Sequence, residues 1–498
     1  MRLHRESRCY GQPAACADFM APYAEAKAKV SLMHHEYVNG PSRPLPTRPW
    51  RRRAPKLSLN TATTYLMNAL IVIIGLTSPF TIKIVGSLPL GEIVLLLSLP
   101  LLLIIQGKNA FGGRRNTVVV LIAIWLLGQI VTDFYRNTDR YDWMRGQATI
   151  VFFLIDFICL AILTRENLVR KIAFLLAFAV GLIFAIRYQP NEMMRDYSWK
   201  FGYAMPVTIL ILLVASLFYR FRIYPIVLAC FVLLIFFNFI FSFRSEILFL
   251  FVTIVLVVPL IPERIGRMRL LPPRKSIARV FVLAGLAVVG GGLSILSVNF
   301  IASAGLGGRR AQEKNTEQLE SKQGLLLSGR PEILVSSQAV LDSPILGHGS
   351  WAKDPKYAEM LHDVEVRNGV STLDMQYILE ETNGLIPAHS QLMGAWVFAG
   401  IAGVPIWIYL FWISLKAVSQ ISLHRPALTP LYCWLFTSFL WAILFSPFGS
   451  TVRITEAFTI NIVIDILNSG GPAHTMKRGR KFGKWRRTIP RRQALQNA

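Results

Sequence analysis

Acidic residues are scarce in this 498-residue chain, which has 28 Asp and Glu against 53 Lys and Arg and a formal charge of +25. Charged residues of both signs make up only 16% of the chain, well below the roughly 25% that is usual for a soluble domain. Hydrophobic residues, in contrast, make up 53%. This balance excludes an ordinary soluble globular domain and indicates a membrane protein.

Cysteine is also rare, with five residues in the whole chain. All five lie in segments that we expect in the cytoplasm or within the membrane. The sequence therefore predicts no disulfide framework. Cys9 and Cys16 lie near His4, but no second cysteine pair follows at the spacing of a zinc site. The first 56 residues lack the apolar core of a signal peptide. Their Pro, Ala and Arg content predicts a disordered tail instead.

Long apolar runs are the main feature that the sequence does have. About 20 apolar residues cross the hydrocarbon core of a bilayer, and about twelve runs in this chain approach that length. We therefore predict an all-α, polytopic transmembrane helical bundle of about twelve spans. The predicted spans are residues 57–78, 84–106, 116–134, 147–164, 170–187, 202–218, 223–241, 246–261, 279–301, 390–415, 428–446 and 454–469.

The positions of the basic residues predict how the chain is threaded. With a cytoplasmic N-terminus, most Lys and Arg fall in the two tails and in inside loops such as GKNAFGGRRN and PERIGRMRLLPPRKSIAR, as the positive-inside rule requires. We expect the basic tails 1–56 and 470–498 to lie in the cytoplasm and to contact anionic lipids rather than nucleic acid. Spans 1–9 then occupy residues 57–301, and spans 10–12 occupy 387–469.

One predicted outer connection is far longer than the others. Residues 302–386 separate spans 9 and 10, well beyond the usual loop length, and hold 12 acidic to 8 basic residues. Three segments in it have apolar residues at helical spacing, and Pro331 fits the first turn of the first of them. The segments are SGRPEILVSSQAVLDSP, DPKYAEMLHDVEVR and STLDMQYILEE. We therefore expect a periplasmic loop that forms a partly helical cap over the bundle.

This topology brings three cationic or titratable residues to one membrane face. Arg244 lies at the outer junction of spans 7 and 8, Arg330 opens the first cap helix, and His389 precedes the apolar span 10. Each also has a purely structural interpretation. Arg244 would extend its charge to the interface, Arg330 would be a surface charge, and His389 would be a hydrogen-bonded interfacial residue.

Helical geometry favours a buried direction for His389. In a helix that turns about 100° per residue, Trp396, Gly400 and Gly403 fall within about 40° of His389. Small residues line helix contacts in membranes. On this phase, the His389 side chain is expected to face the bundle rather than lipid.

The order of these segments resembles the O-antigen ligase and polysaccharide polymerase superfamily. In that family an arginine ends a mid-chain span, a long outer loop carries a Gly-Arg, a helix and a P-x-x-G-x-G turn, and a His and a Gly-x-x-Gly span follow. The likeness covers residues 240–410, and the sequence around Arg244 departs from the S-R-G of the family. The matching residues are Arg244, Arg330, Pro344, Gly347, Gly349, His389, Ser390, Gly400 and Gly403.

The resemblance implies a metal-independent glycosyltransferase without a cofactor, at the periplasmic face of a bacterial inner membrane. Its donor would be a glycan on undecaprenyl pyrophosphate, its acceptor a hydroxyl of another glycan or of lipid A core, and its partners the polysaccharide assembly machinery. Arg244 and Arg330 would bind the pyrophosphate, and His389 would deprotonate the acceptor. Glu380 and Glu381 are possible orienters or alternative bases, although acids near a helix end are more often solvated.

A flippase or secondary transporter is the competing class. Glu92 in span 2 and Asp156 in span 4 favour it, because carboxylates inside a membrane often mark ion or proton paths. Either acid has a structural alternative, namely a buried polar partner such as Asn238. The single large loop, with the candidate residues all toward one face, differs from the repeated halves and midplane sites of many transporters.

Overall fold

The computed structural model describes residues 59–258, 330–367 and 384–469, apart from 85, 166, 192–193, 196 and 242. It also describes residues 264–265, 268–269, 289–290, 292, 296 and 300. Both predicted tails, most of predicted span 9 and the third predicted cap helix lie outside these residues. Apart from Leu59, all of the described residues belong to one compact unit, Asn60–Ala498.

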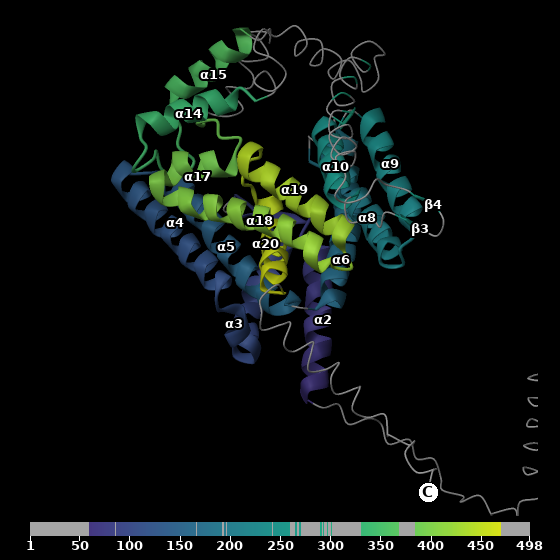
Figure 1. Ribbon diagram of the computed structural model, residues 1–498. Coiled ribbons are helices and arrows are strands. Elements are labelled where there is room, and N and C mark those ends of the chain that lie inside the picture. Colours follow the sequence, from purple (N-terminus) through teal and green to yellow (C-terminus); the bar gives the residue numbers. More distant parts are fainter. Residues whose placement is uncertain are drawn as a thin grey trace, which may run out of the picture. The chain divides into compact units, whose positions relative to one another are not determined.

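Helices make up nearly all of the regular structure in the described part of the chain, which is therefore all-α (Figure 1). The first group is α2 (Leu59–Thr77), α3 (Leu90–Ala110), α4 (Arg114–Arg136), α5 (Arg140–Thr164), α6 (Leu168–Tyr188), the π-helix η1 (Ser198–Tyr203), α8 (Ala204–Arg220), α9 (Tyr224–Ile240) and α10 (Arg244–Val257). The second group is α14 (Glu332–Asp342), α15 (Pro355–Arg367), α17 (Gln391–Ala399), the 3₁₀ helix η3 (Gly400–Gly403), α18 (Val404–His424), α19 (Thr429–Phe445) and α20 (Ser450–Ser469).

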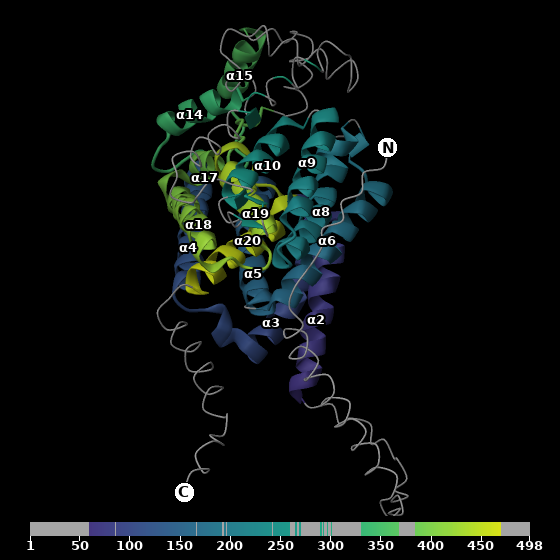
Figure 2. The ribbon, with the colours of Figure 1, turned by 45° about the vertical axis from the view of Figure 1, so that its right-hand side comes forward.

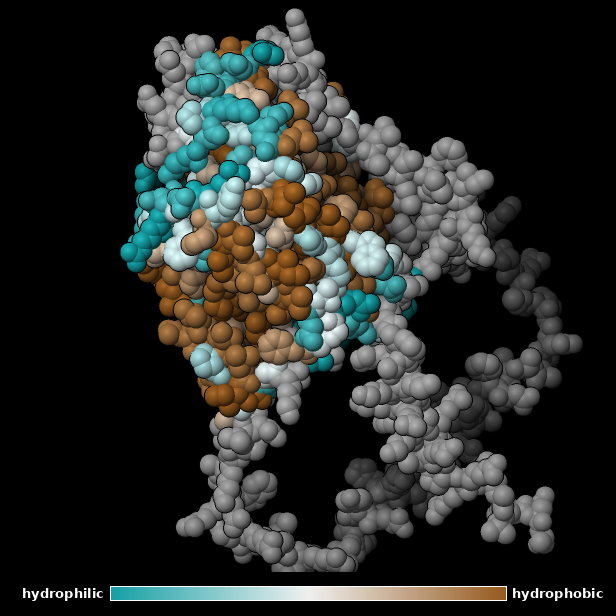
Figure 3. Space-filling model, turned by 90° about the vertical axis from the view of Figure 1, so that its left-hand side faces the viewer, coloured by the Kyte–Doolittle hydropathy of each residue, from teal (hydrophilic) through white to brown (hydrophobic). Residues whose placement is uncertain are grey.

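Six helical segments of the described chain are long and apolar enough to cross a membrane. Shorter apolar helices accompany them at Thr61–Thr77, Tyr224–Ile240 and Thr429–Phe445. Large apolar side chains on these helices are exposed, for example Leu97 at 76% and Ile104 at 83%. Figure 3 shows one such hydrophobic face, with hydrophilic residues gathered toward one end. Since exposed apolar surface of this extent needs lipid contact, the protein is embedded in a membrane.

The connection between the first two predicted spans is a hairpin rather than an irregular loop. Strands β1 (Thr81–Ile84) and β2 (Gly86–Pro89) pair antiparallel, with Thr81 opposite Pro89. Pro89 has an extended backbone and leads directly into α3. The predicted second span therefore begins at Leu90, six residues later than its apolar composition suggests. A second short hairpin joins β3 (Arg264–Ile265) to β4 (Met268–Arg269).

Helix α20 lies at the centre of the packing, in contact with α5, α18 and α19 (Figure 2). Its side chains are buried from Arg453 to Ile466 with the exception of one partly exposed position. The helix is not among the six long apolar segments, because it carries several polar residues. Buried polar groups are expensive unless they are paired, so the partners of α20 organise the bundle.

Candidate functional site

The described part of the predicted cap consists of residues 330–367, and this segment is called the cap. Helices α14 and α15 pack through a small apolar cluster that includes Val335, Ala339 and Tyr357. Asp342, the last residue of α14, accepts hydrogen bonds from Lys356 Nζ at 2.5 Å and from the Tyr357 hydroxyl at 2.6 Å. These bonds, the Lys356 bond above all, hold the pKa of Asp342 well below its usual value. Both predicted helices are confirmed, and the first ends before Ser343 as expected.

The turn Pro344–Gly349, between α14 and α15, contacts the predicted span 10. That span is not one continuous helix, because Gly400 interrupts it between α17 and η3 with φ +61°. A continuous helix would bond Ile401 N–H to the carbonyl of Val397. Here Ile401 N–H instead donates to the carbonyl of Ile345 at 3.1 Å, and Val397 accepts from His348 N–H at 2.7 Å. The turn therefore satisfies the main-chain groups that the break leaves open.

Gly400 is required at this break on two grounds. Its positive φ suits glycine, and a Cβ atom there would lie 2.0 Å from the carbonyl oxygen of Ile345. Gly347 and Gly349 on the facing turn also have positive φ values, of +75° and +95°. Gly347 and Gly400 thus serve one purpose, which is to let the cap turn approach the broken helix closely, whereas Gly403 allows a close approach to Ala395 of α17.

The last turn of α4 holds the same segment from the other side. Asp133 is 2% exposed and accepts from the Ser350 N–H at 2.6 Å and from its hydroxyl at 2.7 Å. Arg136 donates to the carbonyl of Gly347 at 3.0 Å and to the Ser343 hydroxyl at 2.7 Å. Hydrogen bonds to charged groups are the stronger ones, so the bundle fixes residues 343–350 firmly.

His389 and Glu332 face each other at the junction of cap and bundle. His389 Nδ1 lies 3.5 Å from Glu332 Oε1, and the two side chains are 42% and 21% exposed. The second carboxylate oxygen of Glu332 is buried and has no hydrogen-bond partner in the described part of the chain. A histidine whose Nδ1 faces a carboxylate presents Nε2 to its surroundings. The pair is therefore suited to general base chemistry, with Glu332 orienting the ring.

The helical-phase prediction for His389 is wrong in its reasoning. Helix α17 begins at Gln391 with Ser390 as its N-cap, so His389 precedes the helix. The break at Gly400 also separates Gly403 from the phase of α17. His389 nevertheless points toward a partner, because Glu332 on α14 lies beside it.

The N-terminus of α17 is anchored to two central helices. The Ser390 hydroxyl accepts from Met393 N–H and donates to the carbonyl of Ile443 on α19 at 2.9 Å. The Gln391 amide donates to the Glu456 carboxyl on α20. Ser390, Gln391 and Glu456 are all buried. The residue directly before them, His389, is therefore carried on a rigidly held backbone.

The other predicted site residues lie at different places. Arg330 is partly exposed and precedes Glu332 by two residues, so the chain itself keeps it near His389. Arg244 opens α10, a helix that packs against α9 and α19. The structure thus joins His389 to the Arg330 segment, and it does not show Arg244 joined to them. The predicted orienters, Glu380 and Glu381, lie outside the described residues.

A buried ion pair crosses the middle of the bundle. Arg453 on α20 donates two hydrogen bonds to Glu92 on α3, at 2.8 and 2.6 Å, with side chains 5% and 0% exposed. Asp156 on α5 is also 0% exposed, and neither of its oxygens meets a donor among the described residues. Glu92 thus has a buried polar partner, as the structural alternative expected, but this partner is Arg453. Asn238, the example considered from the sequence, instead accepts from the Trp199 indole at 2.9 Å.

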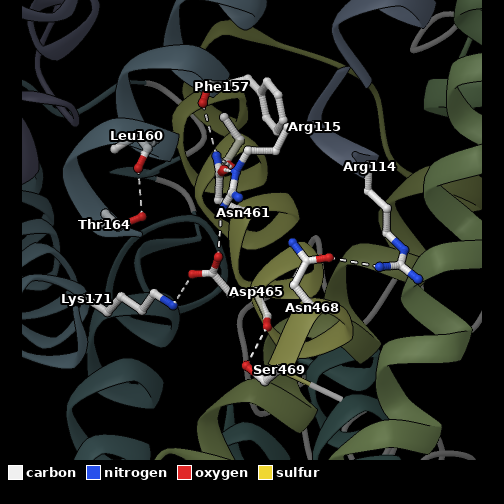
Figure 4. Close-up of polar contacts among 11 residues, drawn as sticks. Arg114, Arg115, Phe157, Leu160, Thr164, Lys171, Asn461, Asp465, Asn468 and Ser469 are labelled. Carbon is white, nitrogen blue, oxygen red and sulfur yellow. Dashed lines mark hydrogen bonds and ion pairs between the residues drawn. The ribbon is translucent and has the colours of Figure 1, made fainter. Parts of the chain in front are cut away.

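A second buried charge network is shown in Figure 4, and it includes Arg115 at the end of α4 opposite to the end that contacts the cap. Asp465 on α20 accepts from Arg115 on α4 and from Lys171 on α6, both at 2.6 Å. Arg115 and Asp133 stand at opposite ends of α4, about 27 Å apart at 1.5 Å per residue. That separation approaches the thickness of a hydrocarbon core, about 30 Å, which agrees with a helix that crosses it.

Sequence reasoning missed three functional or structural partners: Glu332, Glu456 and Arg453. A signal existed for Glu332, because it follows Arg330 at the start of an amphipathic helix. Arg453 had the weakest signal, since it lies one residue before the predicted twelfth span. In the described part of the chain, no group of three or more His, Cys, Asp or Glu side chains is arranged to hold a metal ion. Comparison with protein-family models, curated proteins and solved structures gives no match.

Proposed function

We propose that the protein is a membrane-embedded glycosyltransferase of surface polysaccharide assembly, of the O-antigen ligase or polymerase type. The observation that carries this proposal is the facing pair of His389 and Glu332 at the junction of a polar cap and an apolar bundle. Glu332 lies two residues after Arg330 in the chain. A lipid-linked donor and a water-soluble acceptor meet at such a boundary. In this proposal the cap is periplasmic, both tails are cytoplasmic, and the membrane is the bacterial inner membrane.

His389 would act as the general base. Its Nε2 would take the proton from an acceptor sugar hydroxyl while that oxygen attacks the anomeric carbon of the donor. The bond from the anomeric carbon to the pyrophosphate oxygen would break, and undecaprenyl pyrophosphate would leave with the electron pair. A carboxylate on Nδ1 stabilises the imidazolium that forms. The 3.5 Å between Glu332 Oε1 and His389 Nδ1 supports this role, since such a distance can shorten when substrate binds.

Arg330 would stabilise the pyrophosphate that departs. A guanidinium stays charged and can bind two phosphate oxygens at once, and the contact strengthens as negative charge develops in the transition state. Arg244 remains a second candidate for the same group by its resemblance to the family. Its position on α10 supports this role less directly than the position of Arg330 on the cap.

The acceptor class is suggested by the charge of the long loop. Residues 302–386 hold 12 acidic and 8 basic residues, and this net negative composition disfavours docking of a highly phosphorylated lipid A core. The balance favours a neutral or lightly charged glycan acceptor, as in a polymerase. A flippase or secondary transporter is the alternative, and the buried carboxyl of Asp156 is the observation that favours it.

Deletion of the gene in its host separates these functions. Single repeat units retained on the lipid carrier, with no long chains, would identify a polymerase, and long chains stranded on the carrier would identify a ligase. Carrier-linked units retained on the cytoplasmic leaflet would identify a flippase. Unchanged carrier intermediates and surface polysaccharide would refute all three.

The site is tested by His389→Ala and Arg330→Ala, each of which should abolish transfer while the protein stays in the membrane at normal abundance. The matched control is His362→Ala on α15, whose ring lies 3.6 Å from its neighbour Asp363. Transfer by this control should equal that of the wild type. Wild-type transfer by His389→Ala would remove the proposed base.

A further inference from the structure

Gln391 and Glu456 form a buried amide–carboxyl contact in which one donor is missing. The Gln391 Nε2–H donates to Glu456 Oε1. The remaining two oxygens, Gln391 Oε1 and Glu456 Oε2, are both buried, and no donor in the described part of the chain reaches either. The two residues are 1% and 6% exposed. Two acceptors without a donor are costly at such a site, because a buried polar group that lacks a hydrogen bond has lost its hydration without compensation.

We propose that Glu456 binds a proton and, as a neutral carboxylic acid, forms a cyclic pair of two hydrogen bonds with the Gln391 carboxamide. In this pair the amide N–H donates to the acid carbonyl, and the acid O–H donates to the amide carbonyl. One proton therefore satisfies both open oxygens. If the amide is turned over, its oxygen faces the carboxyl instead, and that contact also needs a proton on Glu456.

The charges around Glu456 support the neutral form. Helices α17 and α19, which pack at this end of α20, contain no charged residue. The lysine of α18, Lys416, is exposed, and its Nζ lies over the Trp412 ring, 3.3 Å from the ring centroid. Arg453, one turn earlier on α20, is bound to Glu92, with Asp156 of α5 close by. Among the described residues, Glu456 Oε2 meets no donor and Oε1 meets the Gln391 amide alone, so an ionised Glu456 would carry a buried charge without a paired cation.

The proton site is close to the candidate base along the chain. Gln391 is the first residue of α17 and follows His389 by two positions. Loss of the proton would leave a negative charge and oxygens without hydrogen-bond donors between α17 and α20. It would therefore weaken the contact that holds the N-terminus of α17 to α20. The position of His389 is therefore coupled to a proton held inside the bundle. The proton site itself does not depend on the proposed glycosyl transfer.

Infrared difference spectroscopy of the purified, full-length protein at neutral pH tests this proposal. The spectrum of the wild type minus that of Glu456→Gln should contain the C=O stretch of a protonated carboxylic acid, and this band should shift down in D2O. The matched control is Glu359→Gln on α15, an exposed acid that should give carboxylate bands only. Carboxylate bands in the Glu456 difference spectrum would overturn the proposal. A water molecule or a cation, rather than a proton, would then satisfy the two oxygens.

A second variant tests the partner. Gln391→Leu removes the carboxamide, so the C=O band of Glu456 should move to higher frequency as its hydrogen bonds are lost. An unshifted band would show that the amide is not the partner. Glu456→Gln should keep the melting temperature of the wild type, because its amide group can complete the same cycle, and Glu456→Met should lower it. Equal melting temperatures for the Gln and Met variants would also contradict the pair.

Discussion

Replacement of Arg453 with methionine is expected to destabilise the protein strongly, because it leaves Glu92 buried without its cation. The two hydrogen bonds of this pair, at 2.8 and 2.6 Å, are both charge-assisted and lie in a dry interior. Removal of one partner from a buried ion pair costs about 3–5 kcal/mol. We therefore expect the free energy of unfolding to fall by about that amount.

The assay is equilibrium unfolding in mixed micelles with increasing SDS, followed by circular dichroism. The double variant Glu92→Leu with Arg453→Met should recover most of the loss, since apolar replacement of both partners is often close to neutral. Arg114→Met is the matched control, because Arg114 makes an exposed hydrogen bond to Asn468 and its loss should cost less than about 0.5 kcal/mol. A wild-type midpoint for Arg453→Met, or no recovery in the double variant, would refute the reasoning.

Two further predictions concern the cap and its contact with Gly400. Because the Lys356 bond lowers the pKa of Asp342, this contact stabilises the cap at every pH above about 3.9, the ordinary aspartate value, and is lost as the pH falls below it. The protection factors of the α14 and α15 amides against hydrogen exchange should accordingly stay constant from pH 7 to about pH 5 and fall only in stronger acid, and an earlier fall would contradict the pairing. Gly400→Ala should lower the melting temperature by an amount equivalent to about 1–3 kcal/mol, because its Cβ would collide with Ile345. Gly449→Ala, which meets nothing within 4 Å, should have little effect, and equal melting temperatures for the two variants would exclude the collision.

The sequence predicted most of the helices, because long apolar runs have few other stable forms in a membrane. The two helices of the cap were also within reach, since their apolar spacing and terminal residues are local signals. Boundaries were less accurate where a local conformation intervened, as in the hairpin that delays α3 to Leu90. The helices and the hairpin depend on residues close together in the chain, so their signals can be found in a single sequence.

The remaining features depend on residues far apart in the sequence. Composition cannot reveal that Gly400 ends a helix, because its conformation is set by a turn about fifty residues earlier. Glu92 in an apolar run indicates that a partner is needed, but the sequence offers many cations besides Arg453. The partner of His389 was missed for a related reason, since its position was derived from a continuous helix that does not exist.

The broken helix constrains the order in which the protein can be assembled. Its open main-chain groups at Val397 and Ile401 are completed by residues 345–348, which leave the ribosome first. The cap turn can therefore complete these groups as soon as α17 and α18 arrive beside it. A helix pair that inserted before the turn was in place would carry unpaired backbone groups at its break. Formation of the candidate site thus depends on the placement of the turn as well as on the insertion of the helices.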